Sequence, residues 1–190
     1  MNTTRKEEIQ FAAAKLFGKK GFAASSVRDI AQEVGLGAAS LYNHMGSKDE
    51  LLTTICFRCA RAFEEGMKHI DQMKVAPVEK IRQLIALQIS IALHDESSLT
   101  VFNDEWKHLL EPHLSEFLRL RRAYETTYLR IIKEGMEQGQ LNPTDPYLVF
   151  QMILSSLRWL HLGSTPKKTK LDEITLTEQI TSIIIKGITT

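Results

Sequence analysis

The sequence is short of cysteine, of net charge and of long apolar runs. Two cysteines in 190 residues cannot build the disulfide framework of a small secreted domain, so a cytoplasmic protein is the simpler interpretation. The polar N-terminal stretch lacks the apolar core of a signal peptide, and no apolar run approaches the length of a membrane span. We therefore expect a cytoplasmic protein with no membrane partner.

A basic surplus is also missing. The chain carries 24 basic and 23 acidic side chains, a formal net charge of +1. Residues 1–50 are just as balanced, with seven basic and six acidic side chains. Proteins that bind nucleic acids often carry a clear basic excess. Without a polybasic patch, affinity for DNA would have to come from individually placed contacts and from dimerisation.

Sustained strand-like alternation is absent as well, whereas apolar residues recur at helical spacing along most of the chain. Outside the segment discussed next, the pattern predicts helices over residues 4–19, 48–72, 78–94, 98–110, 112–138, 145–162 and 176–188, with a solvated loop over 164–170. The predicted fold class is therefore all-α, and 190 residues suffice for one or two domains with a substantial core.

The most informative segment is residues 25–52, SSVRDIAQEVGLGAASLYNHMGSKDELL. Ser26 is a good N-cap for a short helix, and Gly35 stands where a left-handed residue ends it. A second short helix is predicted over residues 38–44. Ser47 and Glu50 then have the spacing of a capping box, which starts a long helix at Lys48. Two short helices joined by a tight turn form a helix-turn-helix, which places one helix in the major groove of DNA.

Three stretches of the first quarter carry a recognisable pattern: RKEEIQFAAAKLFGKKGF over 5–22, SSVRDIAQEVGL over 25–36 and SLYNHMGSKDEL over 40–51. In them the chain resembles the DNA-binding domain of the TetR family of transcriptional regulators. The run Leu-Tyr-x-His-x-x-Ser-Lys-x-x-Leu is the most specific part. Gly37, Ala39 and Met45 depart from the residues usual in the family, which bears on base contacts more than on the fold.

The resemblance implies a helix-turn-helix DNA-binding domain of three helices over residues 1–47. It also implies a helical effector-binding and dimerisation domain over 48–190. The implied function is that of a ligand-responsive transcriptional repressor, released from a palindromic operator by a small apolar or acyl-CoA-like effector. No catalytic residue, cofactor or metal is expected, so the protein would not be an enzyme.

Ten residues are predicted to contact double-stranded DNA. On the recognition helix the exposed positions are Ala38, Ala39, Ser40, Asn43 and His44, and only Asn43 has an amide suited to bidentate bonding with adenine. Ser25, Ser26 and Arg28 lie at the start of the preceding helix, where they can meet phosphates. By resemblance, Tyr42, His44 and Lys48 match positions that commonly hold phosphates. The alternative is that Tyr42 is half-core, Lys48 a solvated helix start and Asn43 ordinary surface.

The last two predicted helices are more apolar than one buried stripe requires. Residues 147–162 are apolar on most sides, and such a helix must be buried on most sides. It could be the central helix of a monomer or could pack against a second subunit. The resemblance favours the second option, a homodimer through the last two helices. Two-fold symmetry in the protein then predicts a palindromic operator.

Aromatic residues of the C-terminal part could line an effector pocket. The predicted pocket residues are Phe102, Trp106, Phe117, Tyr124, Tyr128, Phe150 and Arg158. The alternative is that the rings simply form the core. Arg158 lies in an apolar stretch, where an arginine needs a ligand, an acidic partner, a second subunit or a route to water.

Two short motifs suggest a different class, an all-α bundle that carries a metal or a lipid without binding DNA. Glu105 and His108 have the E-x-x-H spacing of di-iron bundles, but such sites need a second E-x-x-H and two further glutamates. Cys56 and Cys59 form a single C-x-x-C pair, whereas structural zinc needs four ligands. Both motifs are therefore interpreted as ordinary parts of a helical fold.

Overall fold

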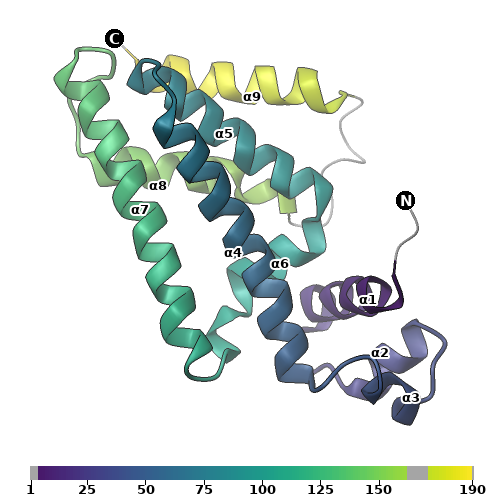
Figure 1. The fold of residues 1–190 in the computed structure, drawn as a ribbon. Helices are drawn as coiled ribbons and strands as arrows, with labels where there is room; N and C mark the ends of the chain where they lie inside the picture. The colour runs from purple at the N-terminus through teal and green to yellow at the C-terminus, as the bar shows by residue number, and fades with distance from the viewer. Residues whose placement is uncertain (1–3, 162–170, 190) are drawn as a thin grey trace. The chain divides into compact units, whose positions relative to one another are not determined.

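The computed structural model describes residues 4–161 and 171–189, and its regular structure in these ranges is helical apart from one isolated antiparallel bridge between Leu141 and Thr189. The predicted all-α class is confirmed (Figure 1). The α-helices are α1 Arg5–Lys20, α2 Val27–Glu33, α3 Ala38–Tyr42, α4 Lys48–Gln72, α5 Pro77–His94, α6 Glu96–Asp104, α7 His113–Glu137, α8 Pro146–Leu157 and α9 Glu173–Ile188. Two 3₁₀ helices, η1 Trp106–His108 and η2 Arg158–His161, follow α6 and α8. The predicted loop over 164–170 lies outside the described residues.

Three predicted helices are interrupted or end at least two residues earlier in the structure. The prediction of one helix over 145–162 is wrong, because α8 ends at Leu157 and the chain tightens into η2. There the Ser156 hydroxyl donates to the Ile153 carbonyl, a bond that competes with the regular backbone pattern. The helix predicted over 98–110 is likewise divided into α6 and η1, and the recognition helix ends at Tyr42 rather than His44.

The chain forms two compact units. Unit 1 consists of residues Met1–Ala60 and Ser97–Leu118, and unit 2 of Arg61–Glu96 and Arg119–Thr190. Helices α4 and α7 each contribute residues to both units. This division differs from the predicted domains 1–47 and 48–190, because a segment from the middle of the chain packs with the N-terminal helices.

The first helix of unit 1, α1, is capped at both ends. The Thr4 hydroxyl accepts from the Glu7 N–H at 3.3 Å, and the Glu7 carboxylate accepts from the Thr4 N–H at 2.7 Å. This capping box lowers the pKa of Glu7, chiefly through the backbone hydrogen bond. Gly21 caps the C-terminal end of α1, and its φ of 84° is a conformation that glycine adopts without strain. The apolar side of α1 joins a buried core whose members include Ile9, Ala13, Phe17, Ile30, Leu41, Leu52 and Ile55.

Unit 2 is organised around α5. This helix contacts α8, η2 and α9, and Figure 1 shows α9 running beside it. Fully buried side chains come from α5, α7 and α8, and the set includes Ile81, Leu84, Ile85, Ile89, Tyr128, Ile131, Ile132 and Ile153. Aliphatic side chains dominate this set, and the buried aromatic residues of unit 2 include Tyr128 and Phe150.

Gly135 of α7 allows a close approach within unit 2. A Cβ at this position would lie 2.8 Å from Leu141 Cδ1 and 3.4 Å from Pro77 Cβ. We expect Gly135→Ala to lower the melting temperature by about 2–4 °C, because overpacking of about 1–3 kcal/mol outweighs the gain in helix propensity of about 1 kcal/mol. Gly18→Ala is the matched control, since its Cβ would make only an ordinary contact, 3.5 Å from Thr100 Cγ2. Equal melting temperatures for the two variants would contradict the prediction.

Candidate nucleic-acid interface

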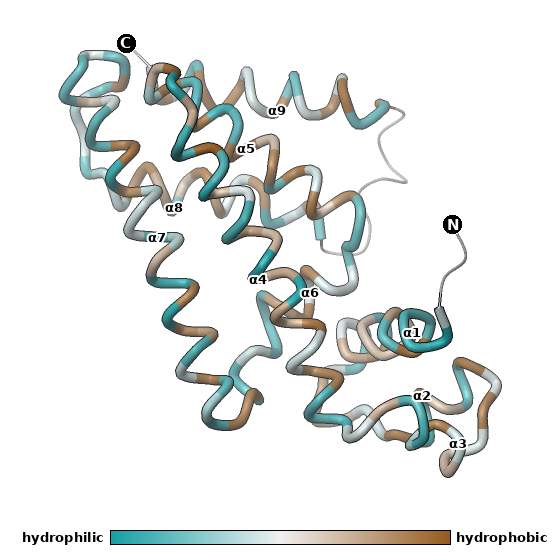
Figure 2. Tube along the Cα trace, in the orientation of Figure 1, coloured by the Kyte–Doolittle hydropathy of each residue, from teal (hydrophilic) through white to brown (hydrophobic). Residues whose placement is uncertain are grey.

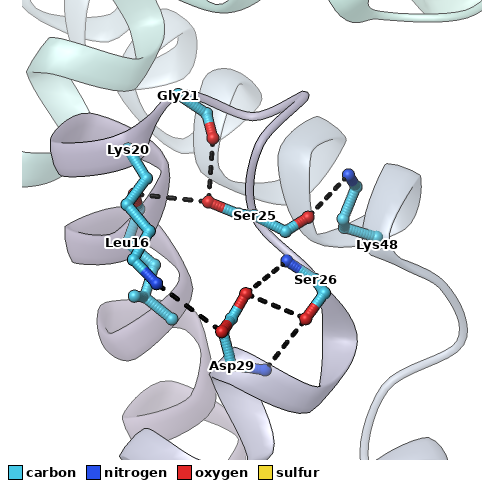
Figure 3. A network of polar contacts seen from close by, with 7 residues as sticks. All are labelled: Leu16, Lys20, Gly21, Ser25, Ser26, Asp29 and Lys48. Atoms are coloured by element: carbon cyan, nitrogen blue, oxygen red, sulfur yellow. Dashed lines mark hydrogen bonds and ion pairs between the residues drawn. The ribbon is translucent and has the colours of Figure 1, made fainter.

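Helices α2 and α3 form the predicted helix-turn-helix. Ser26 caps α2 with its hydroxyl, and the Asp29 carboxylate accepts from both the N–H and the hydroxyl of Ser26 at 2.8 Å (Figure 3). These bonds lower the pKa of Asp29, the backbone bond most, so the carboxylate is ionised at neutral pH. Gly35 has a φ of 65° and ends the helix, and the Leu36 N–H donates to the Ala31 carbonyl at 2.8 Å.

The buried residues of this motif leave one side of α3 exposed. Ile30, Leu41 and Met45 are all at most 7% exposed, so they fix α3 against α2 and the start of α4. Tyr42, in contrast, is 53% exposed, and Asn43 and His44 are exposed beside it. Of the other predicted contacts, Arg28 and Ala39 are exposed, while Ala38, Ser40 and Lys48 are half-buried.

The side chain of Ser25 faces inward. It is 3% exposed, and its hydroxyl donates to the Gly21 carbonyl at 2.8 Å and lies 3.4 Å from the Leu16 carbonyl (Figure 3). The prediction that the Ser25 hydroxyl meets a phosphate does not fit this geometry, because the buried hydroxyl already donates to backbone carbonyls of α1 and the following turn. Ser26 is exposed, but both its donors are engaged by Asp29. Neither serine is part of the contact set that we propose.

Lys48 is bound to the same turn. Its ammonium donates to the Ser25 carbonyl at 2.9 Å and to the Phe22 carbonyl at 3.0 Å, and lies 4.1 Å from the centre of the Phe22 ring. Figure 3 shows the bond to Ser25. An ammonium has three N–H groups, so a phosphate contact by Lys48 would have to use the third. This role in the turn was not predicted, since Lys48 and Phe22 are 26 residues apart.

Six of the seven predicted pocket residues are aromatic, and they fall into two clusters, one in each unit. In unit 1, the Phe117 ring lies 5.3 Å from Phe102 and 6.1 Å from Trp106. In unit 2, Tyr128 lies 5.9 Å from Tyr124 and 5.3 Å from Phe150, measured between ring centres. Arg158 is exposed at the C-cap of α8 rather than inside that helix.

Unit 2 also buries a small polar group that sequence analysis missed. Gln88 is 7% exposed and donates to the Tyr124 hydroxyl at 3.2 Å. The Tyr128 hydroxyl is fully buried and has no hydrogen-bond partner among residues 4–161 and 171–189. Burial raises the pKa of both tyrosines, so both hydroxyls stay protonated at physiological pH.

This difference between the two tyrosines predicts opposite effects of removing each hydroxyl. Tyr124→Phe leaves the buried Gln88 donor unpaired, so the free energy of unfolding should fall by about 1–3 kcal/mol. Tyr128→Phe removes a hydroxyl without a partner and should leave stability unchanged or slightly raised. Urea unfolding of both variants measures this, and a marked loss in Tyr128→Phe would show that its hydroxyl has a partner in solution.

Large apolar side chains remain exposed on α8 and α9. The exposed set is Tyr147, Leu148, Met152, Ile174 and Ile183, between 52% and 73% exposed. Figure 2 shows hydrophobic residues recurring along both helices, although their buried sides already pack in unit 2. Exposed large apolar side chains of this kind are candidates for a protein–protein interface.

The two motifs of the alternative class belong to the core and turns of unit 1. Burial raises the pKa of the Cys56 thiol to about 12, so the thiolate that zinc requires is disfavoured. Glu105 accepts from the Phe22 N–H at 3.0 Å, and the His108 ring lies 5.4 Å from the Phe22 ring. Over the described ranges, no three histidine, cysteine or acidic side chains gather as metal ligands do, and no helix has the length and apolarity needed to cross a membrane.

Two family models match the chain. Residues 11–55 match the model described as bacterial regulatory proteins, tetR family. Residues 74–167 match the model described as tetracyclin repressor-like, C-terminal domain. The first match contains the whole helix-turn-helix, and the second contains α5 to α8.

Several known proteins are similar over nearly the whole chain. The HTH-type transcriptional repressor KstR2 of Mycolicibacterium smegmatis is 26% identical, over 98% of this chain and 91% of that protein. The solved structure of the ketosteroid transcriptional regulator KstR2 of Mycobacterium tuberculosis has a TM-score of 0.87 at 24% identity, over 100% of this chain and 97% of that one. AibR, solved in complex with isovaleryl coenzyme A and operator DNA, has a TM-score of 0.78 at 20% identity, over 95% and 97% of the two chains.

Proposed function

Because the chain belongs to the TetR family of transcriptional regulators, which are DNA-binding proteins and not enzymes, we propose that it is a homodimeric repressor released from a palindromic operator by a small effector. The observation that carries this proposal is the helix-turn-helix of α2 and α3, which exposes Tyr42 at the end of α3 and Asn43 and His44 directly after it. A repressor acts where the genome lies, so the cytoplasm is the proposed location.

The proposed DNA contacts divide into base and phosphate contacts. Asn43 reads a base through its amide, and Ala38 and Ala39 offer apolar contact, for example to a thymine methyl. Arg28, Tyr42, His44 and the third N–H of Lys48 bind phosphates, with Ser40 beside them on α3. These few contacts fit a helix-turn-helix that lacks a polybasic patch, because a dimer presents each contact twice.

The homodimer is proposed to form through α8 and α9. In support, Met152 is 61% and Ile183 is 73% exposed in the single chain, an unfavourable exposure for large aliphatic side chains that a second subunit would remove. A two-fold interface joins the same patch on both subunits, so each exposed residue is buried twice.

The effector is proposed to be apolar or an acyl-CoA thioester. The aromatic clusters of both units support an apolar ligand, since rings provide most of the contact area in such pockets. The relatives point the same way: one is a ketosteroid transcriptional regulator, and another was solved in complex with isovaleryl coenzyme A. Arg158 is the candidate partner for an anionic group of the effector.

The proposed mechanism is a population shift. The free dimer favours a separation of its two helix-turn-helix motifs that matches successive major grooves, and the effector favours a different separation. Helix α4 contributes residues to both units, so it is the element proposed to transmit the change. Linkage then requires operator DNA to weaken effector binding by the same factor.

Selection of bound sequences from a random DNA pool tests the proposal, followed by titration of the enriched sequence at two salt concentrations. A palindromic site whose affinity falls steeply with salt is the expected result. If well-folded protein enriches no sequence at low salt, the proposal fails. Metal and lipid analysis of the purified protein would then test the bundle class.

A further inference from the structure

The turn between α1 and α2 is held at both polar groups of one residue, Phe22. Its N–H donates to the Glu105 carboxylate at 3.0 Å, and its carbonyl accepts from the Lys48 ammonium at 3.0 Å. Its ring is 7% exposed and lies 5.1 Å from the Phe17 ring. We call the contacts of Glu105 and Lys48 with the Phe22 backbone the Phe22 clamp.

Glu105 comes from a distant part of the sequence, 83 residues after Phe22, between α6 and η1. Its side chain is 16% exposed, and the oxygen that accepts from Phe22 lies 3.5 Å from His108 Nε2. Its other carboxylate oxygen lies 3.8 Å from where a Cβ on Gly21 would stand. The carboxylate is therefore fitted closely onto the turn, where a charge-assisted bond to a backbone N–H is stronger than a neutral one.

The Lys48 arm of the clamp comes from α4. The Lys48 ammonium donates to the carbonyls of both Phe22 and Ser25, so it fixes the backbone at both of these residues. Two elements, α4 and the α6–η1 junction, thus hold one short turn within unit 1. Arg58 of α4 also connects elements of unit 1. Its guanidinium donates to Ser98 of α6 at 2.5 Å and to Gln10 of α1 at 3.4 Å.

The turn held by the Phe22 clamp determines the direction in which the chain enters the helix-turn-helix. It follows Gly21, where α1 ends, and precedes Ser26, the N-cap of α2. Since α3 is fixed to α2 through Ile30 and Leu41, a change of direction at Phe22 would move Arg28 and Asn43 together. Displacements of about 1 Å are enough to disrupt hydrogen bonds to base edges, whose useful length range is narrow.

We infer that Glu105 is a positioning residue for DNA binding: by accepting from the Phe22 N–H, it holds the α1–α2 turn in the orientation that operator recognition requires. The inference rests on the proposed function for its consequence at DNA, but the contact itself is a property of the free protein. Through this hydrogen bond the α6–η1 junction would influence the orientation of the helix-turn-helix directly, in addition to the influence proposed for α4.

Glu105→Ala and Glu105→Gln test the inference, because both remove the charge but only the glutamine keeps an oxygen that can accept from Phe22. In Glu105→Ala, amide hydrogen exchange at Phe22 should accelerate about ten- to 100-fold, the factor that corresponds to losing a charge-assisted hydrogen bond. Affinity for the selected operator should fall about ten-fold or more, with non-specific DNA affinity unchanged. Glu105→Gln should retain operator affinity to within about three-fold.

Glu137→Ala, which removes an exposed acid of α7 in unit 2, is the control for the change in net charge and should leave both measurements unchanged. Equal losses in Glu105→Ala and Glu105→Gln, or unchanged Phe22 exchange in Glu105→Ala, would overturn the inference. So would accelerated exchange with full operator affinity. If the wild-type chain selects no operator, the proposed function has failed, while the exchange comparison still decides whether Glu105 holds the turn.

Discussion

Asn43→Ala is expected to weaken binding to the selected operator about ten- to 100-fold while leaving binding to unrelated DNA unchanged. A bidentate pair between an amide and adenine contributes about 1–3 kcal/mol of discrimination against the wrong base. Asn43 is exposed after the last residue of α3, so its truncation opens no cavity and the melting temperature should not change. Titrations of operator and scrambled duplex at one salt concentration measure the difference.

Arg28→Ala is the matched comparison, because Arg28 is also exposed but is proposed to bind a phosphate. It should weaken binding to every sequence by a similar factor and reduce the dependence of log affinity on log salt by about one unit. If Asn43→Ala behaves in this same uniform way, Asn43 does not read a base and specificity must come from Ala38, Ala39 or DNA shape.

Ile183→Asp is expected to convert the proposed dimer into monomers and to lower operator affinity about 10²–10⁴-fold, since joining two binding modules raises overall affinity by this range. Ile183 is 73% exposed in the single chain, so a charge there does not disturb the core of unit 2. In a dimer interface, however, it would bury two unpaired carboxylates. Sedimentation equilibrium distinguishes a 21.6 kDa monomer from a species of twice that mass.

Val75→Asp is the control for introducing the same charge at an exposed apolar residue outside α8 and α9. Val75 is 43% exposed and lies in the connection between α4 and α5. It should leave both the mass and the operator affinity unchanged. A dimer that survives Ile183→Asp would mean that the subunits associate through a different face.

The helix-turn-helix could be predicted in detail because its signals are local. Ser26 caps α2 with Asp29, Gly35 adopts a positive φ, and α4 begins at Lys48, all as the sequence indicates. Each of these depends on residues within four positions of one another, where the chemistry of caps and turns is strong. The end of α3 was predicted two residues late, which is a usual uncertainty at a helix terminus.

The contacts that hold this motif could not be predicted, because their partners are far apart in the sequence. Nothing near Glu105 indicates that its carboxylate accepts from Phe22, and its spacing with His108 suggested metal chemistry instead. The inward orientation of Ser25 depends on where the Gly21 carbonyl lies in the folded turn. Local sequence specifies elements well, whereas tertiary packing decides what each polar side chain finally meets.

Because residues 97–118 pack with the N-terminal helices, the helix-turn-helix does not belong to a unit formed by one continuous stretch of sequence. A chimera joined after residue 47 would carry Phe22 without Glu105. The Phe22 N–H would then face whichever residue the other protein has at the position of Glu105. Engineers who wish to exchange operator specificity between regulators of this kind should therefore move two discontinuous segments together. The same coupling constrains divergence, since a substitution at Glu105 must be tolerated by a turn encoded 83 residues earlier.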